Sequence, residues 1–128
     1  MSCKGGQSNA ALYDPLRLHP EAKAALARVP EDRSVVFGQL VEDMGGRLDA
    51  FYNSLGEYDG VAIFEAPDEQ TAHSIELTAS QPGHLKETKI MTLLPIEKSV
   101  EAMREASKRE YPAPKGWLDR AHSELWGG

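Results

Sequence analysis

The feature that most constrains the fold is a short run of residues that is apolar on both faces. Val61-Ala62-Ile63-Phe64 forms the middle of the segment 58–65. Side chains in a strand point alternately to opposite faces, so an unbroken apolar run indicates a strand that is covered on both sides. The run is also too short for a buried helix. We therefore expect residues 58–65 to form a central strand.

The residues before this run predict a helix followed by a partner strand. Apolar residues recur at helical spacing after Pro30, at Phe37, Leu40, Val41 and Met44. Gly45 and Gly46 then supply a left-handed helix stop, and alternation over residues 47–55 indicates a strand. A turn at Gly56 and Glu57 joins this strand to the next, so the two should form a hairpin.

The remaining pattern alternates helices and strands. A helix is expected from Pro20 to Pro30, another after the capping residue Asp68, and a last one from Pro95 to just before Pro112. Residues 85–94 read as a strand. The segment 10–18 is a first strand that Asp14 and Pro15 are expected to shorten or distort, because proline donates no ladder hydrogen bond.

This order predicts an α+β, ferredoxin-like fold, a split βαβ arrangement with an antiparallel sheet and its helices on one face. We divide the chain into a poorly defined N-terminal segment (1–19), the ferredoxin-like domain (20–110), and a linker with a short amphipathic tail (111–128). In the tail, Trp117, Ala121 and Leu125 recur at helical spacing. We therefore expect a short helix that docks on the body or on a second subunit.

Several blocks of residues, in one order, resemble the signature of the GYD-domain family. They are Gly45-Gly46-Arg47-Leu48, Ala50-Phe51-Tyr52, Gly56-Glu57-Tyr58-Asp59 and Val61-Ala62-Ile63-Phe64-Glu65-Ala66-Pro67-Asp68. The resemblance covers about residues 30–106. It implies a fold similar to the dimeric α/β-barrel superfamily, whose members pair two sheets face to face, and hence a homodimer. Asp14 and Pro15 depart from the regular first strand of the family.

Composition excludes several functional classes. The net charge is −6 and the basic residues are dispersed, so nucleic acid is not an expected partner. The single cysteine, Cys3, has no partner, and no Cys/His cluster predicts a metal site or a cofactor. No apolar run approaches the length of a membrane span. The expected location is the cytoplasm, with no membrane partner.

The candidate site residues lie near the ends of the two best-defined strands: Tyr52, Tyr58, Asp59 and His73. A tyrosine beside an aspartate at a strand end could relay a proton. Turn chemistry is the stronger explanation of Gly56-Glu57-Tyr58-Asp59, with a glycine at the hairpin, an Asx-type hydrogen bond at the turn aspartate and a tyrosine that packs at the sheet edge. Two hypotheses follow. The favoured one is a non-enzymatic dimeric module that binds a small molecule or a partner; the alternative is a small cofactor-independent enzyme with acid/base residues near Tyr58 and Asp59.

Overall fold

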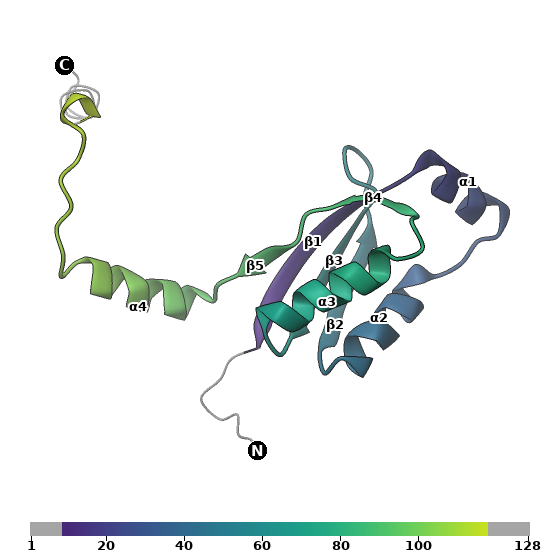
Figure 1. Cartoon of the computed structure of the whole chain (residues 1–128), viewed down its shortest axis with the longest axis horizontal. Coiled ribbons are helices and arrows are strands. Elements are labelled where there is room, and N and C mark those ends of the chain that lie inside the picture. Colours follow the sequence, from purple (N-terminus) through teal and green to yellow (C-terminus); the bar gives the residue numbers. More distant parts are fainter. Residues whose placement is uncertain (1–8, 118–128) are drawn as a thin grey trace. The chain divides into compact units, whose positions relative to one another are not determined.

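The computed structural model describes residues 9–117 and divides the chain into two units, 1–93 and 94–128. The first unit has five strands and three helices (Figure 1). Its elements are β1 (Ala10–Leu18), α1 (Pro20–Arg28), α2 (Arg33–Asp43), β2 (Arg47–Asn53), β3 (Gly60–Ala66), α3 (Glu69–Ser80), β4 (Leu85–Thr88) and β5 (Met91–Leu93).

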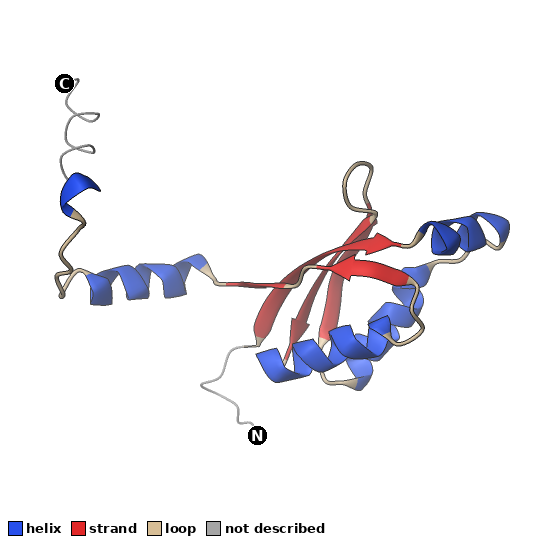
Figure 2. Cartoon of the chain, turned by 45° about the horizontal axis from the view of Figure 1, so that its top comes forward, coloured by secondary structure: helices blue, strands red, loops and turns tan. Residues whose placement is uncertain are grey.

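The sheet is antiparallel, with strand order β2-β3-β1-β4 and β5 also paired to β1. This order is that of a ferredoxin-like fold, with α1 as an additional helix after β1. Helices α2 and α3 lie on one side of the sheet, as Figure 2 shows. The predicted α+β class is therefore confirmed.

The apolar run of β3 is central, as its sequence predicts. Its side chains alternate between fully buried and half-buried, and Phe64 is completely inaccessible to solvent. Phe37 of α2 packs edge-on against Phe64, with 5.4 Å between the ring centroids. The residues buried with Phe64 come from β1, β3, α2 and α3: Leu12, Val41, Ala62, Ala66, Ala72 and Ile75. This set is called the packed core below.

The caps and stops that the sequence indicates are in place. The Asp68 carboxylate accepts a hydrogen bond from the Thr71 amide at 2.8 Å and caps α3. Gly45 has a φ of +88°, as a left-handed stop requires. At Gly46 a Cβ atom would lie 2.1 Å from the Glu65 carbonyl oxygen, so only glycine allows β2 to begin this close to β3.

Strand β1 is not shortened as expected, although its pairing with β4 has a register shift between Arg17 and Leu18. It runs for nine residues in the middle of the sheet. The Pro15 carbonyl accepts a hydrogen bond from the Lys89 amide at 3.0 Å, and Lys89 lies between β4 and β5. The nitrogen of Pro15, which has no hydrogen to donate, faces the same side of β1 as its carbonyl. The missing hydrogen bond therefore falls at the gap between β4 and β5. The predicted strand 85–94 is accordingly two short strands.

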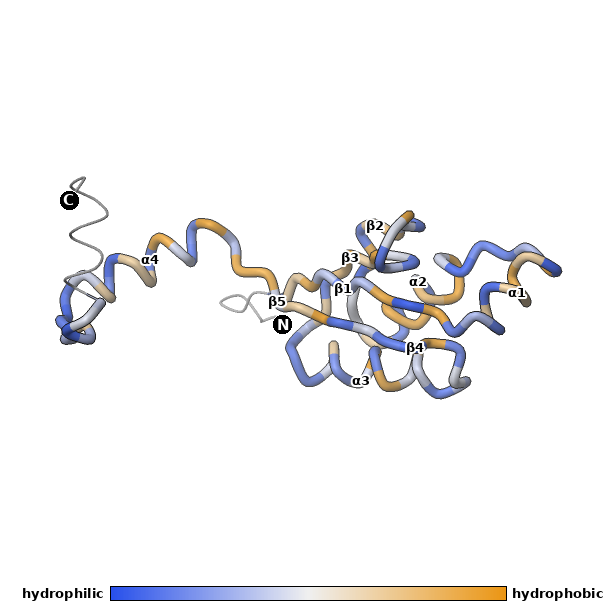
Figure 3. The backbone as a smooth tube through the Cα atoms, turned by 90° about the horizontal axis from the view of Figure 1, so that it is seen from above, coloured by the Kyte–Doolittle hydropathy of each residue, from blue (hydrophilic) through white to orange (hydrophobic). Residues whose placement is uncertain are grey.

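The second unit is described by itself. Its helix α4 (Ile96–Ala106) is amphipathic, and apolar positions recur between charged ones along it (Figure 3). The apolar residues Ile96 and Met103 are exposed. The docking helix predicted for the tail falls mainly on residues 118–128, which are outside the described part of the chain. None of the helices between residues 9 and 117 has both the length and the apolar composition that crossing a bilayer requires.

Candidate functional site

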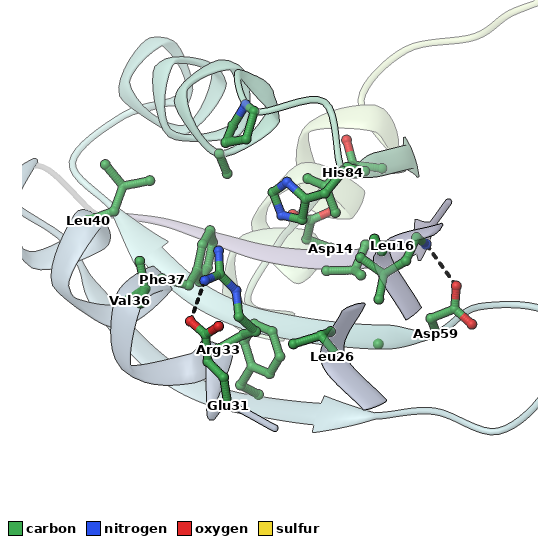
Figure 4. Close-up of a pocket in the computed structure, with 18 of the residues that line it drawn as sticks. Asp14, Leu16, Leu26, Glu31, Arg33, Val36, Phe37, Leu40, Asp59 and His84 are labelled. Carbon is green, nitrogen blue, oxygen red and sulfur yellow. Dashed lines mark hydrogen bonds and ion pairs between the residues drawn. The ribbon is translucent and has the colours of Figure 1, made fainter. Parts of the chain in front are cut away.

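A cavity of about 680 Å³ lies in the first unit, on the helix-covered side of the sheet. Helices α1, α2 and α3 and four strands contribute to its wall, which is mainly apolar (Figure 4). The apolar lining consists of Leu16, Leu18, Ala22, Ala25, Leu26, Val36, Phe37, Leu40, Phe51, Ala79, Pro82 and Leu85. Phe37 connects the cavity to the packed core, because its side chain lines the cavity and its ring also packs on Phe64.

Asp14 is the most unusual residue of this wall. It occupies the β1 position between Leu12 and Leu16, and side chains two residues apart share one face of a strand. The carboxyl group therefore points to the apolar, helix-covered face. The residue is only 4% exposed, and its Oδ1 atom has no hydrogen-bond partner among the described residues. A buried polar atom without a partner is costly, which makes this oxygen a candidate ligand contact.

Burial also changes the protonation of Asp14. Desolvation, and after it the negative charge of Glu76, raises the pKa of its carboxyl group to about 7. A backbone hydrogen bond from Lys89 acts in the opposite direction, more weakly. At neutral pH, Asp14 is therefore close to half-protonated. It can give or take a proton without a large change in pH.

Glu76 approaches the cavity from α3 and is held by two neighbours. The Thr88 hydroxyl of β4 donates a hydrogen bond to its Oε2 atom. The His73 Nδ1 atom lies 3.3 Å from Oε1 on the exposed surface of the same helix. These contacts fix the carboxylate at the edge of the cavity, near enough for its charge to act on Asp14.

The other charged residues of the wall are already paired. Arg33 donates to Glu31 at 2.5 Å. Asp59 accepts from the Leu18 amide at 2.8 Å and lies 3.2 Å from the Lys23 ammonium. The amide of Leu18, more than any other contact, keeps the pKa of Asp59 below its usual range.

Among residues 9–117, His84 is the only histidine in the wall. Burial, and then the positive charge of Arg33, lowers the pKa of the His84 imidazole. The ring is therefore neutral at pH 7 and contributes no positive charge to the cavity. It remains able both to donate and to accept a hydrogen bond there.

The four residues predicted from sequence do not meet in one place. Only Asp59 lines the cavity. Arg17 lies over the ring of Tyr58, 5.1 Å from its centroid, among charged neighbours of the strand ends. Tyr52 is 62% exposed, and its pairing with Val61 places it on the sheet face opposite the helices. His73 touches the site only through Glu76.

Sequence reasoning missed Asp14, Glu76 and His84 as members of one site. One signal for Asp14 was available: a carboxylate whose neighbours at i−2 and i+2, Leu12 and Leu16, are apolar. Such a residue in a central strand must point at the core. The pairing with Glu76 had no local signal, because 62 positions separate the two residues and only the packing of α3 on the sheet brings them together.

Comparisons with known proteins agree with this architecture. Two solved structures share the fold with a TM-score of 0.50: the MtbAldR protein, 13% identical over 67% of this chain, and an AsnC family transcriptional regulator from Agrobacterium tumefaciens, 12% identical over 74%. The alignments cover 52% and 56% of those chains, so this chain spans about half their length. No match was found among the curated proteins. Residues 16–103 match the family model of the GYD domain, and the chain therefore belongs to the GYD domain family.

Proposed function

We propose that this protein is a homodimeric module that binds a small, largely apolar molecule in the cavity beneath the sheet. The observation that carries the proposal is the unpartnered Oδ1 atom of buried Asp14, which faces a largely apolar hollow. The volume of about 680 Å³ is within the usual range for small-molecule sites. Such sites combine an apolar wall with a few polar groups, and Asp14, Glu76 and His84 are those groups here.

The homodimer part of the proposal rests on the other face of the sheet. The strand register places Tyr13, Ile63 and Tyr52 on the face opposite the packed core. Met91 and Leu93 of β5 join them, and both are more than two-fifths exposed. An apolar sheet face without helices is a natural surface for a second copy. Tyr52 is then a contact for the partner rather than for the small molecule.

An enzymatic role is the second candidate, and one observation favours it. Asp14 has a pKa of about 7 and lies near a second carboxylate, Glu76, in a cavity that can admit a substrate. Carboxyl groups with such environments are suited to general acid/base catalysis. The cavity includes Asp59 but not Tyr58, so this alternative transfers the acid/base role from the hairpin to Asp14.

The structural neighbours, one of which is a transcriptional regulator, support no function here, since identities of 12–13% carry only the fold. The net charge of −6 also gives no support for binding to nucleic acid.

Native mass spectrometry of the protein purified from its own host tests the binding role. We expect a retained small molecule in the wild-type protein. Ala79→Phe adds a ring to the wall of the cavity and should remove the retained mass. Ala24→Phe is the matched control, because Ala24 is exposed on α1 and does not line the cavity. Retention by Ala79→Phe equal to that of the wild type would exclude this cavity as the site.

Sedimentation equilibrium tests the homodimer. Tyr52→Lys should shift the protein to monomer at micromolar concentration, because it places a charge on the proposed interface. Val35→Lys is the control, since Val35 is 67% exposed on α2 and lies away from the strand face. A wild-type protein that is monomeric under these conditions would contradict the homodimer.

A further inference from the structure

We propose that the occupant of the cavity is an organic cation, a small apolar amine whose ammonium group binds Asp14 beside Glu76. The inference rests on the proposed binding function and adds the chemical class of the ligand. It is carried by the balance of charge in the wall, by the unpartnered oxygen of Asp14 and by the apolar lining around both.

The wall holds more negative than positive charge. In the described part of the chain, four carboxyl groups line the cavity, against the single guanidinium of Arg33: those of Asp14, Glu31, Asp59 and Glu76. Arg33 is paired with Glu31, and Asp59 is paired with Lys23 and with the Leu18 amide. Among the described residues, no lysine or arginine pairs with the other two carboxyl groups, and only the His73 ring lies against Glu76, on its exposed side. Above neutral pH, where Asp14 is ionised, the cavity therefore has negative charge in excess, located at Asp14 and Glu76.

An ammonium group is better suited than other polar groups to bind between the carboxyl groups of Asp14 and Glu76. It carries three donors and a positive charge, so it can satisfy the Oδ1 atom of Asp14 and reduce its repulsion from Glu76. An alcohol supplies one donor and no charge. A carboxylate brings a third negative charge to a partly dry site, where charge repulsion is only weakly screened.

The body of the ligand is expected to be apolar. The ring of Phe37 and the side chains of Leu16, Leu26 and Ala79 line the same cavity as Asp14. Phe37 and Phe51 lie with their centroids 6.0 Å apart, which gives the wall an aromatic patch. A hydrocarbon chain or ring would be removed from water against these residues, while the cation remains at the acidic end.

Binding should be linked to protons. Two groups act on Asp14: the carboxylate of Glu76 from α3 and the Lys89 amide after β4. The other titratable or charged groups of the facing wall include His84 and Arg33. His84 is neutral at pH 7, and Arg33 stays charged, so Asp14 is the group that titrates. Its pKa is about 7, and a cation binds its ionised form. Affinity should therefore rise about tenfold per pH unit up to neutrality and level off above it.

Isothermal titration calorimetry tests the proposal with three probes that share an apolar phenylalkyl skeleton and differ in the terminal polar group. The probes are phenylbutylamine, phenylbutanol and phenylbutanoate. At pH 8 we expect the amine to bind at least about tenfold more tightly than the alcohol, and the carboxylate most weakly. Asp14→Asn should abolish the preference for the amine while leaving the alcohol within about twofold. Asp43→Asn is the control, because it removes the same charge from an exposed position of α2 that does not line the cavity, and it should preserve the preference.

The outcomes separate the ligand class from the binding function. Equal affinity for amine and alcohol, or tightest binding of the carboxylate, overturns the cation and leaves the cavity as a binding site. An amine preference that survives Asp14→Asn overturns the role of Asp14. If no probe binds and native mass spectrometry finds no retained molecule, the cation and the proposed function fail together. At pH 6, release of protons on amine binding supports the linkage, and its absence contradicts it.

Discussion

The two ends of the helix-covered sheet face are built from the same strands and differ in how they are filled. At one end, Phe64, Leu12 and Ile75 pack together with no more than 1% exposure. At the other end, Asp14 and Leu16 of the same strand face a cavity of about 680 Å³. Two residues along β1 thus separate a dry, filled core from a hollow with an acid in its wall. We therefore expect the first end to contribute more to stability, and the second is the proposed binding site.

This contrast has a cause in the arrangement of the helices. Val41 of α2 and Ala72 of α3 are buried in the packed core beside β3. Helix α1, which contributes to the wall at the other end, has no buried residue of its own. A loosely packed helix leaves space that a ligand can occupy, and such elements open at lower free energy than a packed core does.

The largest expected effect comes from truncation at the packed end. Phe64→Ala should lower the free energy of unfolding by about 3–5 kcal/mol, since it leaves a cavity among fully buried neighbours. Leu16→Ala at the hollow end should cost about 1 kcal/mol, because its side chain already borders empty space. Urea unfolding monitored by circular dichroism measures both. Equal losses at the two positions would remove the distinction between the regions.

The next effect concerns pH and depends on Asp14. Its pKa is raised in the folded protein, so between about pH 4 and pH 7 the folded state holds a proton that the unfolded state has lost. Stability should therefore fall as pH rises through this window, at up to about 1.4 kcal/mol per pH unit from this group. Asp14→Asn should remove that slope. The check is urea unfolding at several pH values, and an unchanged slope in the variant would assign it to other groups.

Asp59 should behave in the opposite sense, with a smaller effect. The pKa of Asp59 is lowered, chiefly by the Leu18 amide, so its contribution is present at neutral pH and lost in acid as pH falls through the folded value. Asp59→Asn should cost about 1 kcal/mol at pH 7, the order of one hydrogen bond to a charged group that is partly exposed to water. Thermal melts at pH 7 and pH 3 compare the two conditions. A cost that is greater at pH 3 would contradict this role.

Much of the fold could be predicted from the sequence because its signals are local. The apolar run of β3, the stop at Gly45 and the cap at Asp68 each act within a few residues. The length of β1 could not be predicted in this way. Pro15 is tolerated because the neighbouring strand is interrupted near Lys89, and this interruption is a tertiary feature.

The candidate site was less accessible to sequence reasoning for the same physical reason. The hairpin residues Tyr58 and Asp59 are distinctive in sequence, and Asp59 holds the end of β1 through the Leu18 amide. The two interacting carboxyl groups are instead Asp14 of β1 and Glu76 of α3. No residue pattern between these positions predicts that the two groups lie near each other. A lone carboxylate in an apolar strand is the kind of residue that indicates a site only after the strand is known to be central.

The most direct test of the account is the titration of the Asp14 carboxyl carbon by nuclear magnetic resonance, with and without phenylbutylamine. We expect a pKa near 7 in the free protein, because the group is buried beside Glu76 without a partner for Oδ1. We also expect a clear decrease of this pKa when the amine is bound, since a cation favours the ionised form. An ordinary aspartate titration in the free protein, unchanged by the amine, would contradict the claim that Asp14 is the centre of a binding site.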